Sequence, residues 1–134
     1  MEQLWDPLRR KEVAATPEER VRQWLIAQMR DVFGVPEHMM RSEVGFRFGG
    51  KAWRADLVVY DRAGKPLLVA ECKQPDVALT EAVAEQALRY HSVLKVRYVV
   101  LTNGKMTYLY ALKRGVFEPL DRIPRYEEML LCPR

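Results

Sequence analysis

Two apolar runs on either side of a short polar turn constrain the fold of this chain most. Leu57–Tyr60 and Leu67–Ala70 are unbroken apolar runs. Such short runs between turn residues are typical of strands that are covered on both faces. The turn between them, residues 61–66, contains the glycine and the proline that mark a hairpin. The segment 55–73 is therefore predicted to be a buried β-hairpin.

This buried hairpin nevertheless carries three charged side chains, Asp56, Glu71 and Lys73. With the turn centred between residues 63 and 64, Asp61 faces Pro66 and, further from the turn, Asp56 faces Glu71. Because side chains alternate along a strand, Glu71 and Lys73 share one face and the cysteine between them points to the other. The hairpin is thus expected to bring two carboxylates together.

Two carboxylates that face each other on a sheet repel, and burying them without partners costs several kcal/mol, on the order of a buried-ion penalty. A divalent cation would offset both effects, since Mg²⁺ takes carboxylate oxygens as ligands and keeps several waters. Asp56 and Glu71 are therefore predicted to hold a metal ion. Lys73 would add a positive charge beside the water on that ion.

Four stretches of the chain resemble the PD-(D/E)xK nuclease superfamily, and most closely the N-terminal nuclease domain of type I restriction enzyme R subunits and the short proteins similar to it. Asp56 with Glu71-Cys72-Lys73 resembles the D…ExK signature, and Gln86 with Tyr90 resembles the QxxxY element. Ala55 stands where the superfamily has a proline, which leaves the metal ligand intact. The matching stretches, between residues 17 and about 112, are Pro17–Gln23, Arg54–Tyr60, Val69–Lys73 and Gln86–Tyr90.

The resemblance implies an α/β (α+β) domain with a restriction-endonuclease-like mixed central β-sheet flanked by helices. It also implies a Mg²⁺- or Mn²⁺-dependent endonuclease that hydrolyses DNA. Asp56, Glu71 and the backbone carbonyl of Cys72 would hold the ion, and Lys73 would hold or activate the attacking water. Gln86 and Tyr90 would orient phosphate or water.

A first-helix acid reaches the metal site in many of these nucleases, and the sequence offers Glu18 and Glu19. Thr16 is a good N-cap, Pro17 suits the first helical position, and Glu19 stands where a capping box has its acid. Capping is a sufficient structural reason for both glutamates. Glu18 lies on the same helix face as Arg22, so it is favoured as the site acid.

Periodicity and turn residues predict the order of the remaining elements. Gly49–Gly50 and Asn103–Gly104 are expected hairpin turns, and a helix between two strands indicates a right-handed crossover. We expect one domain over residues 1–134, with residues 1–16 and 113–134 as extensions. The expected helices are 17–33 and 80–94, with a further short helix expected within 124–131. The expected strands are 41–48, 51–60, 66–73, 96–102 and 105–112.

Length and charge agree with this reading. The chain has 134 residues and a net charge of +4, which suits one globular domain and favours a polyanionic partner. Two cysteines give no disulfide framework, and no apolar run reaches membrane-spanning length, so a cytoplasmic protein is expected. Candidate phosphate contacts, which position nucleic acid without specifying its sequence, are Arg47, Lys51, Arg54, Lys95 and Arg97.

The sequence contains no GxxxxGK[ST], HExxH, CxxC or GxSxG motif, which argues against an ATP-driven motor, a zinc hydrolase or an α/β-hydrolase on this chain. The expected partners are DNA, a motor or specificity chain, and a second copy in a homodimer. Two other functions compete. One is a non-catalytic nucleic-acid-binding or assembly module, and the other is a structural ion-pair cluster in a small dimer. A buried cluster stabilises poorly, so nuclease chemistry is the prediction.

Overall fold

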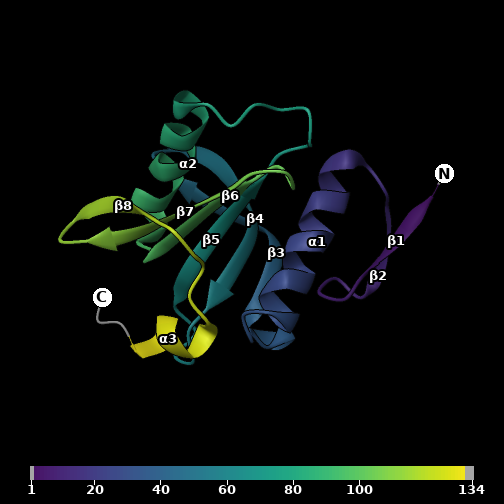
Figure 1. The fold of residues 1–134 in the computed structure, drawn as a ribbon, viewed down its shortest axis with the longest axis horizontal. Coiled ribbons are helices and arrows are strands. Elements are labelled where there is room, and N and C mark those ends of the chain that lie inside the picture. The colour runs from purple at the N-terminus through teal and green to yellow at the C-terminus, as the bar shows by residue number, and fades with distance from the viewer. Residues whose placement is uncertain (1, 132–134) are drawn as a thin grey trace.

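A six-stranded mixed sheet forms the centre of the molecule, with the long helices α1 and α2 on its two sides (Figure 1). The computed structural model describes residues 2–131, except for the side chains of residues 90–93. Neighbouring strands are antiparallel except β5 and β6, which are parallel. In the order of the sheet, the strands are β3 (Met40–Phe48), β4 (Lys51–Tyr60), β5 (Pro66–Cys72), β6 (Tyr98–Thr102), β7 (Thr107–Lys113) and β8 (Val116–Leu120).

Helices bury both faces of this sheet, as the apolar runs predict. Helix α1 (Pro17–Asp31) packs Leu25 and Met29 onto one face, together with the short α3 (Tyr126–Leu131). Helix α2 (Glu81–Leu94) packs Ala87 onto the other face. A 3-10 turn, η1 (Glu37–Met39), leads into β3. The predicted mixed sheet flanked by helices is confirmed, and no helix in residues 2–131 is long and apolar enough to cross a bilayer.

The start of α1 follows its sequence signals only in part. Thr16 Oγ1 accepts a 3.1 Å hydrogen bond from the backbone N–H of Glu19, which satisfies one free donor of the first turn. The capping-box prediction is wrong for the reciprocal bond, because the Glu19 carboxylate accepts from Arg9 and Gln23 instead.

The β4–β5 hairpin has the predicted register over most of its length. Leu57 pairs with Ala70 and Val59 with Leu68, and the same register continued by one residue sets Asp56 opposite Glu71. A bulge follows Val59, so Pro66 pairs with Tyr60 and the predicted pairing with Asp61 is wrong. The reason is the turn itself, because the Asp61 carboxylate accepts the backbone N–H groups of residues 63 and 65 and closes an Asx-type turn.

A crossover through α2 joins β5 to β6, so the carboxyl ends of these two parallel strands lie together. Lys73 donates its backbone N–H to Thr102 O at 2.8 Å. The Asn103 side chain then donates to Val77 O at 2.9 Å and accepts two backbone N–H groups of the predicted hairpin turn. These bonds tie the loop after Lys73 to the end of β6.

Three strands were not expected from the sequence. Strands β1 (Gln3–Asp6) and β2 (Lys11–Ala14) form a separate two-stranded sheet, seen beside α1 at one side of Figure 1. Their four residues each are too few to display a period of two. Strand β8 lies at one edge of the large sheet, within residues 113–134, which were expected to be an extension. The residues called an N-terminal extension are thus a β-hairpin.

Candidate active site

Asp56 on β4 and Glu71 on β5 bring a half-buried and a buried carboxyl group together in the sheet. The Asp56 side chain is 16% exposed, and Glu71 is 8% exposed as a residue. Asp56 Oδ2 accepts a 2.7 Å hydrogen bond from the backbone N–H of Cys72. Glu71 Oε1 is buried and has no hydrogen-bond partner among the residues described. A polar oxygen in this state favours an added cation or donor.

Burial and mutual repulsion perturb this acid pair. Burial, followed by the negative charge of Asp56, raises the pKa of Glu71 to about 8. Burial also raises the pKa of Asp56, against the hydrogen bond from the Cys72 N–H and the positive charges of Arg22 and Lys73. Without a bound cation, Glu71 therefore holds a proton at neutral pH.

Lys73 and Gln86 join Glu71 around a small cavity next to this pair. The cavity measures about 30 Å³ and is also lined by Val83, Ala87 and Leu101, so it can hold a water molecule. Glu71 and Lys73 line it from the end of β5, as their shared face predicts, and Gln86 lines it from α2. The Tyr90 side chain, predicted to act with Gln86, lies outside the described residues.

The two candidate first-helix acids point to different surroundings. Burial and then the charge of Asp56 raise the pKa of Glu18, while Arg22 and Lys73 lower it, so Glu18 lies in the field of the acid pair. Glu19 is 7% exposed and binds Arg9 at 2.5 Å. Charge interactions thus link Glu18 to the acid pair, whereas ion pairs link Glu19 to Arg9 and Arg22.

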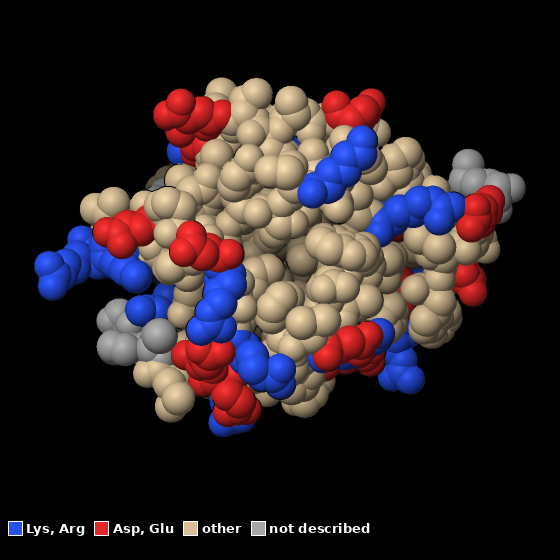
Figure 2. Space-filling view, viewed as in Figure 1, with Lys and Arg blue, Asp and Glu red and all other residues tan. Residues whose placement is uncertain are grey.

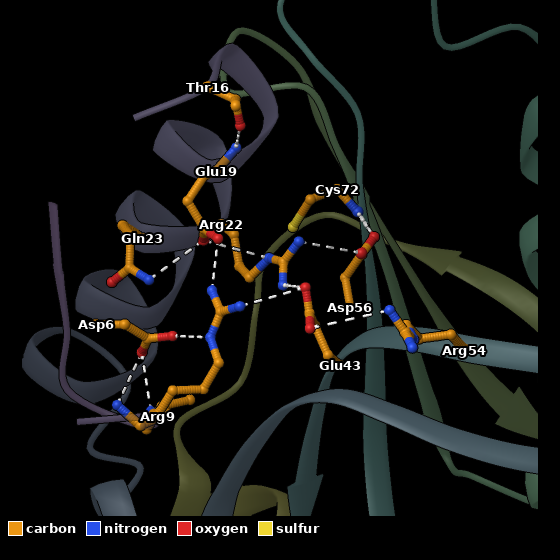
Figure 3. Close-up of polar contacts among 11 residues, drawn as sticks. Asp6, Arg9, Thr16, Glu19, Arg22, Gln23, Glu43, Arg54, Asp56 and Cys72 are labelled. Atoms are coloured by element: carbon orange, nitrogen blue, oxygen red, sulfur yellow. Dashed lines mark hydrogen bonds and ion pairs between the residues drawn. The ribbon is translucent and has the colours of Figure 1, made fainter. Parts of the chain in front are cut away.

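Arg22 and Glu43 belong to the site and were missed as site residues (Figure 3). Arg22 is 6% exposed, its Nη2 lies 3.7 Å from Asp56 Oδ1, and its Nη1 donates to Glu43 Oε1 at 3.0 Å. Glu43 has φ +52°, and the β3–β4 ladder skips it between Ser42 and Val44. A charged residue inside the apolar stripe of α1 was the sequence signal for Arg22.

The candidate phosphate contacts fall into two groups. Arg47, Lys51 and Arg54 lie on the β3–β4 hairpin, towards the end of the sheet where β5 delivers Lys73, because β4 and β5 are antiparallel. The Lys51 ammonium lies 4.8 Å from the centre of the Trp53 ring. This arm projects a basic and aromatic surface beside the acid pair.

The second group is not brought to the site. Lys95 and Arg97 precede β6, and the N–H of Arg97 donates to Leu67 O at the other end of β5 from Glu71. Strand direction therefore separates these two candidates from the hairpin arm, and a phosphate contact at either residue stays a prediction. On the face in Figure 2, basic and acidic side chains are interspersed around the rim, so net charge does not locate the interface.

The donor set fits a hard divalent ion. Asp56 and Glu71 are carboxylates, the ligands that Mg²⁺ takes one or two at a time while keeping waters. Within the described part of the chain, no cluster of three or more His, Cys, Asp or Glu side chains could hold a metal. An ion held by these two carboxylates would have its remaining coordination positions free for water and phosphate oxygens.

Comparison with known proteins agrees with this fold. The sequence profile of the type I restriction enzyme R protein N terminus matches residues 17–124. The chain belongs to this family. A fragment structure of "a putative HsdR subunit of a type I restriction enzyme from Vibrio vulnificus YJ016" matches with a TM-score of 0.60 at 20% identity, over 78% of this chain and 22% of that chain. At this identity the likeness concerns the fold. No curated protein matches the chain.

Proposed function

We propose that this chain is a metal-dependent nuclease of the PD-(D/E)xK type that hydrolyses phosphodiester bonds of DNA. The observation that carries the proposal is the buried pair of Asp56 and Glu71, with a buried Glu71 oxygen that has no hydrogen-bond partner in the described residues. Such a pair opposes folding when it is left alone. Its occurrence beside Lys73 and Gln86 is explained by a task that needs the carboxylates.

Mg²⁺ or Mn²⁺ would be held by Asp56, Glu71 and the Cys72 backbone carbonyl. Such an ion lowers the pKa of the water it binds and offsets the charge that builds up on the phosphate. Lys73 reaches the cavity beside Glu71, from which its ammonium holds the attacking water and helps to move its proton. Gln86, from the other side of that cavity, orients water or a phosphate oxygen through its amide.

The DNA backbone would lie along the β3–β4 arm. Arg47, Lys51 and Arg54 supply cations on the arm, and contacts of this kind set the position of the duplex without reading its sequence. The family is that of R proteins of type I restriction enzymes. We therefore propose a partner chain that carries the motor or the sequence specificity, and DNA as the substrate.

Cleavage assays on the wild type and Lys73→Ala test this function. Supercoiled, linear and single-stranded DNA are incubated with Mg²⁺ or Mn²⁺. Loss of an assisting proton-transfer group lowers the cleavage rate by about 10²–10⁴-fold, while metal binding survives because both carboxylates remain. The matched control is Lys65→Ala, an exposed lysine at the turn end of the same hairpin, which should cut like the wild type.

Equal cutting by the wild type and Lys73→Ala would identify the activity as a contaminant and end the nuclease proposal. The second candidate function is a nucleic-acid-binding module without catalysis. The stacked Lys51–Trp53 pair and the 59% exposed Phe48 on the arm favour it, because basic and aromatic side chains together bind nucleic acid. It predicts DNA binding by the wild type, no metal-dependent cleavage, and a larger binding loss in Arg47→Ala than in Lys73→Ala.

A further inference from the structure

A closed ring of charges connects the N-terminal β-hairpin to Asp56 (Figure 3). Arg9, in the β1–β2 turn, binds Glu19 through Nη2 at 2.5 Å and lies 3.3 Å from Glu43 through Nη1. Arg22 lies on the other side of the same two carboxylates, 3.5 Å from Glu19 and 3.0 Å from Glu43. We call these four residues the ring.

We propose that Arg9 is a positioning residue for the metal site and that the N-terminal hairpin is thereby a working part of this site. The proposal rests on the proposed function, since it concerns the metal ligand Asp56. The hairpin lies outside residues 17–124, which match the family profile. Its role is therefore carried by the contacts of this chain alone.

Arg22 is the link between the ring and the metal ligand. Its side chain is 8% exposed, and it lies within ion-pair distance of three carboxylates. The approach to Glu43, at 3.0 Å, is a hydrogen bond, whereas the approach to Asp56, at 3.7 Å, is not. The hydrogen bond to Glu43 thus holds Arg22 near Asp56, while Arg22 makes no hydrogen bond to Asp56 itself. Asp56 therefore keeps lone pairs for a cation.

Arg9 is suited to hold this arrangement because a guanidinium has several donors in one rigid plane. Its Nε binds Asp6, which is 0% exposed, and its two terminal nitrogens bind Glu19 and Glu43. One side chain therefore fixes the β1–β2 turn, helix α1 and strand β3 relative to one another. An ammonium carries the same charge but cannot make this three-way contact.

Other charged groups also face Asp56. They are Glu18 from α1, Glu71 from β5 and Lys73 directly after β5. Arg54, whose side chain is 70% exposed, lies 4.0 Å from Glu43. These groups contribute charge to the site. The ring differs from them because both of its arginines bind the same two carboxylates, Glu19 and Glu43. If the Arg9 guanidinium is lost, Arg22 is the one ring arginine left to pair with Glu19, Glu43 and Asp56.

The test measures Mn²⁺ binding by the full chain for the wild type, Arg9→Lys and Glu19→Asp. Binding is detected as a loss of the electron paramagnetic resonance signal of free Mn²⁺. Both variants keep every charge, so a change in affinity reports geometry. We expect the dissociation constant for Mn²⁺ to rise about tenfold in each, the lower end of the effect of residues that support metal ligands. Circular dichroism establishes that the variants are folded.

The matched control is Arg20→Met, which removes a different ion pair between the N-terminal hairpin and α1, Arg20 with Glu2 at 2.6 Å. This variant should bind Mn²⁺ within about twofold of the wild type, even though it loosens the same two elements. The inference is overturned if folded Arg9→Lys or folded Glu19→Asp binds Mn²⁺ with wild-type affinity, or if Arg20→Met loses as much affinity as they do. Either result leaves the proposed function standing. A wild type that binds no Mn²⁺ overturns the proposed function and the inference with it.

Discussion

Replacing Glu71 by glutamine should stabilise the protein in the absence of metal. The pKa of Glu71 is raised to about 8 from an ordinary value of 4.5, so between these pH values the native state binds one proton more than the unfolded state. Stability then falls as the pH rises through this window, at about 1.4 kcal/mol per pH unit. Below pH 4.5 both states are protonated, and above pH 8 the loss levels off.

At pH 7 this penalty amounts to about 3 kcal/mol, and Glu71→Gln removes it because the amide has nearly the shape of the protonated acid. Urea unfolding at pH 5, 6, 7 and 8 should therefore show a stability gain of the variant that grows with pH. Glu85→Gln, an exposed position on α2, is the control and should change little. When metal is present, the wild type is expected to be more stable than Glu71→Gln, because the ion stabilises only the wild type.

Unfolding free energies of the wild type and Glu71→Gln that run parallel from pH 5 to 8 would refute the reasoning. They would mean that the native state does not hold the extra proton. The Glu71 carboxyl would then not be buried next to Asp56. Any constant gain between such parallel curves would come from better packing of the amide and not from the loss of a titrating group.

Three further outcomes are expected. Mg²⁺ or Mn²⁺ at a hundredfold excess over the dissociation constant raises the free energy of unfolding by about 2.7 kcal/mol, and with it the melting temperature. Asp56→Ala abolishes this gain in a melting experiment. Thr16→Ala removes the cap of α1 and costs about 1 kcal/mol in urea unfolding. Arg47→Ala with Lys51→Ala weakens DNA binding and lowers the slope of log affinity against log salt by about two, whereas Lys95→Ala, at the other end of the sheet, leaves the slope unchanged in a fluorescence titration.

The sequence located the centre of the fold because the decisive information was local. Asp56 and Glu71 come from one hairpin whose apolar runs set its register, and the strand assignments within it agree with the structure. The bulge at Val59 was not foreseen, since it arises from competition between the ladder and the Asp61 turn. That competition depends on three-dimensional geometry that no count along the chain contains.

The partners of the acid pair were harder to predict because they come from distant segments. Arg9 stands in a run of three basic residues, 9–11, which is the usual composition of a solvated face, yet it is half buried between carboxylates of α1 and β3. Its placement required the β1–β2 hairpin, which is too short to have a sequence signature. Glu43 is an exposed residue of β3, and its positive φ and its contact with Arg22 are properties of the assembled sheet and helix that the sequence does not display.

The positions of Glu43 and Pro119 also bear on how the sheet ends. Strands β3 and β8 are the two edges of the six-stranded sheet, and an open edge is a template for adding a strand from another molecule. Glu43, with φ +52°, interrupts the regular backbone of β3 at its middle. Pro119 lies in β8 opposite Tyr110 and has no N–H to offer. Both edges thus resist growth into intermolecular sheets, so the residues that serve the site on one edge also guard the protein against aggregation.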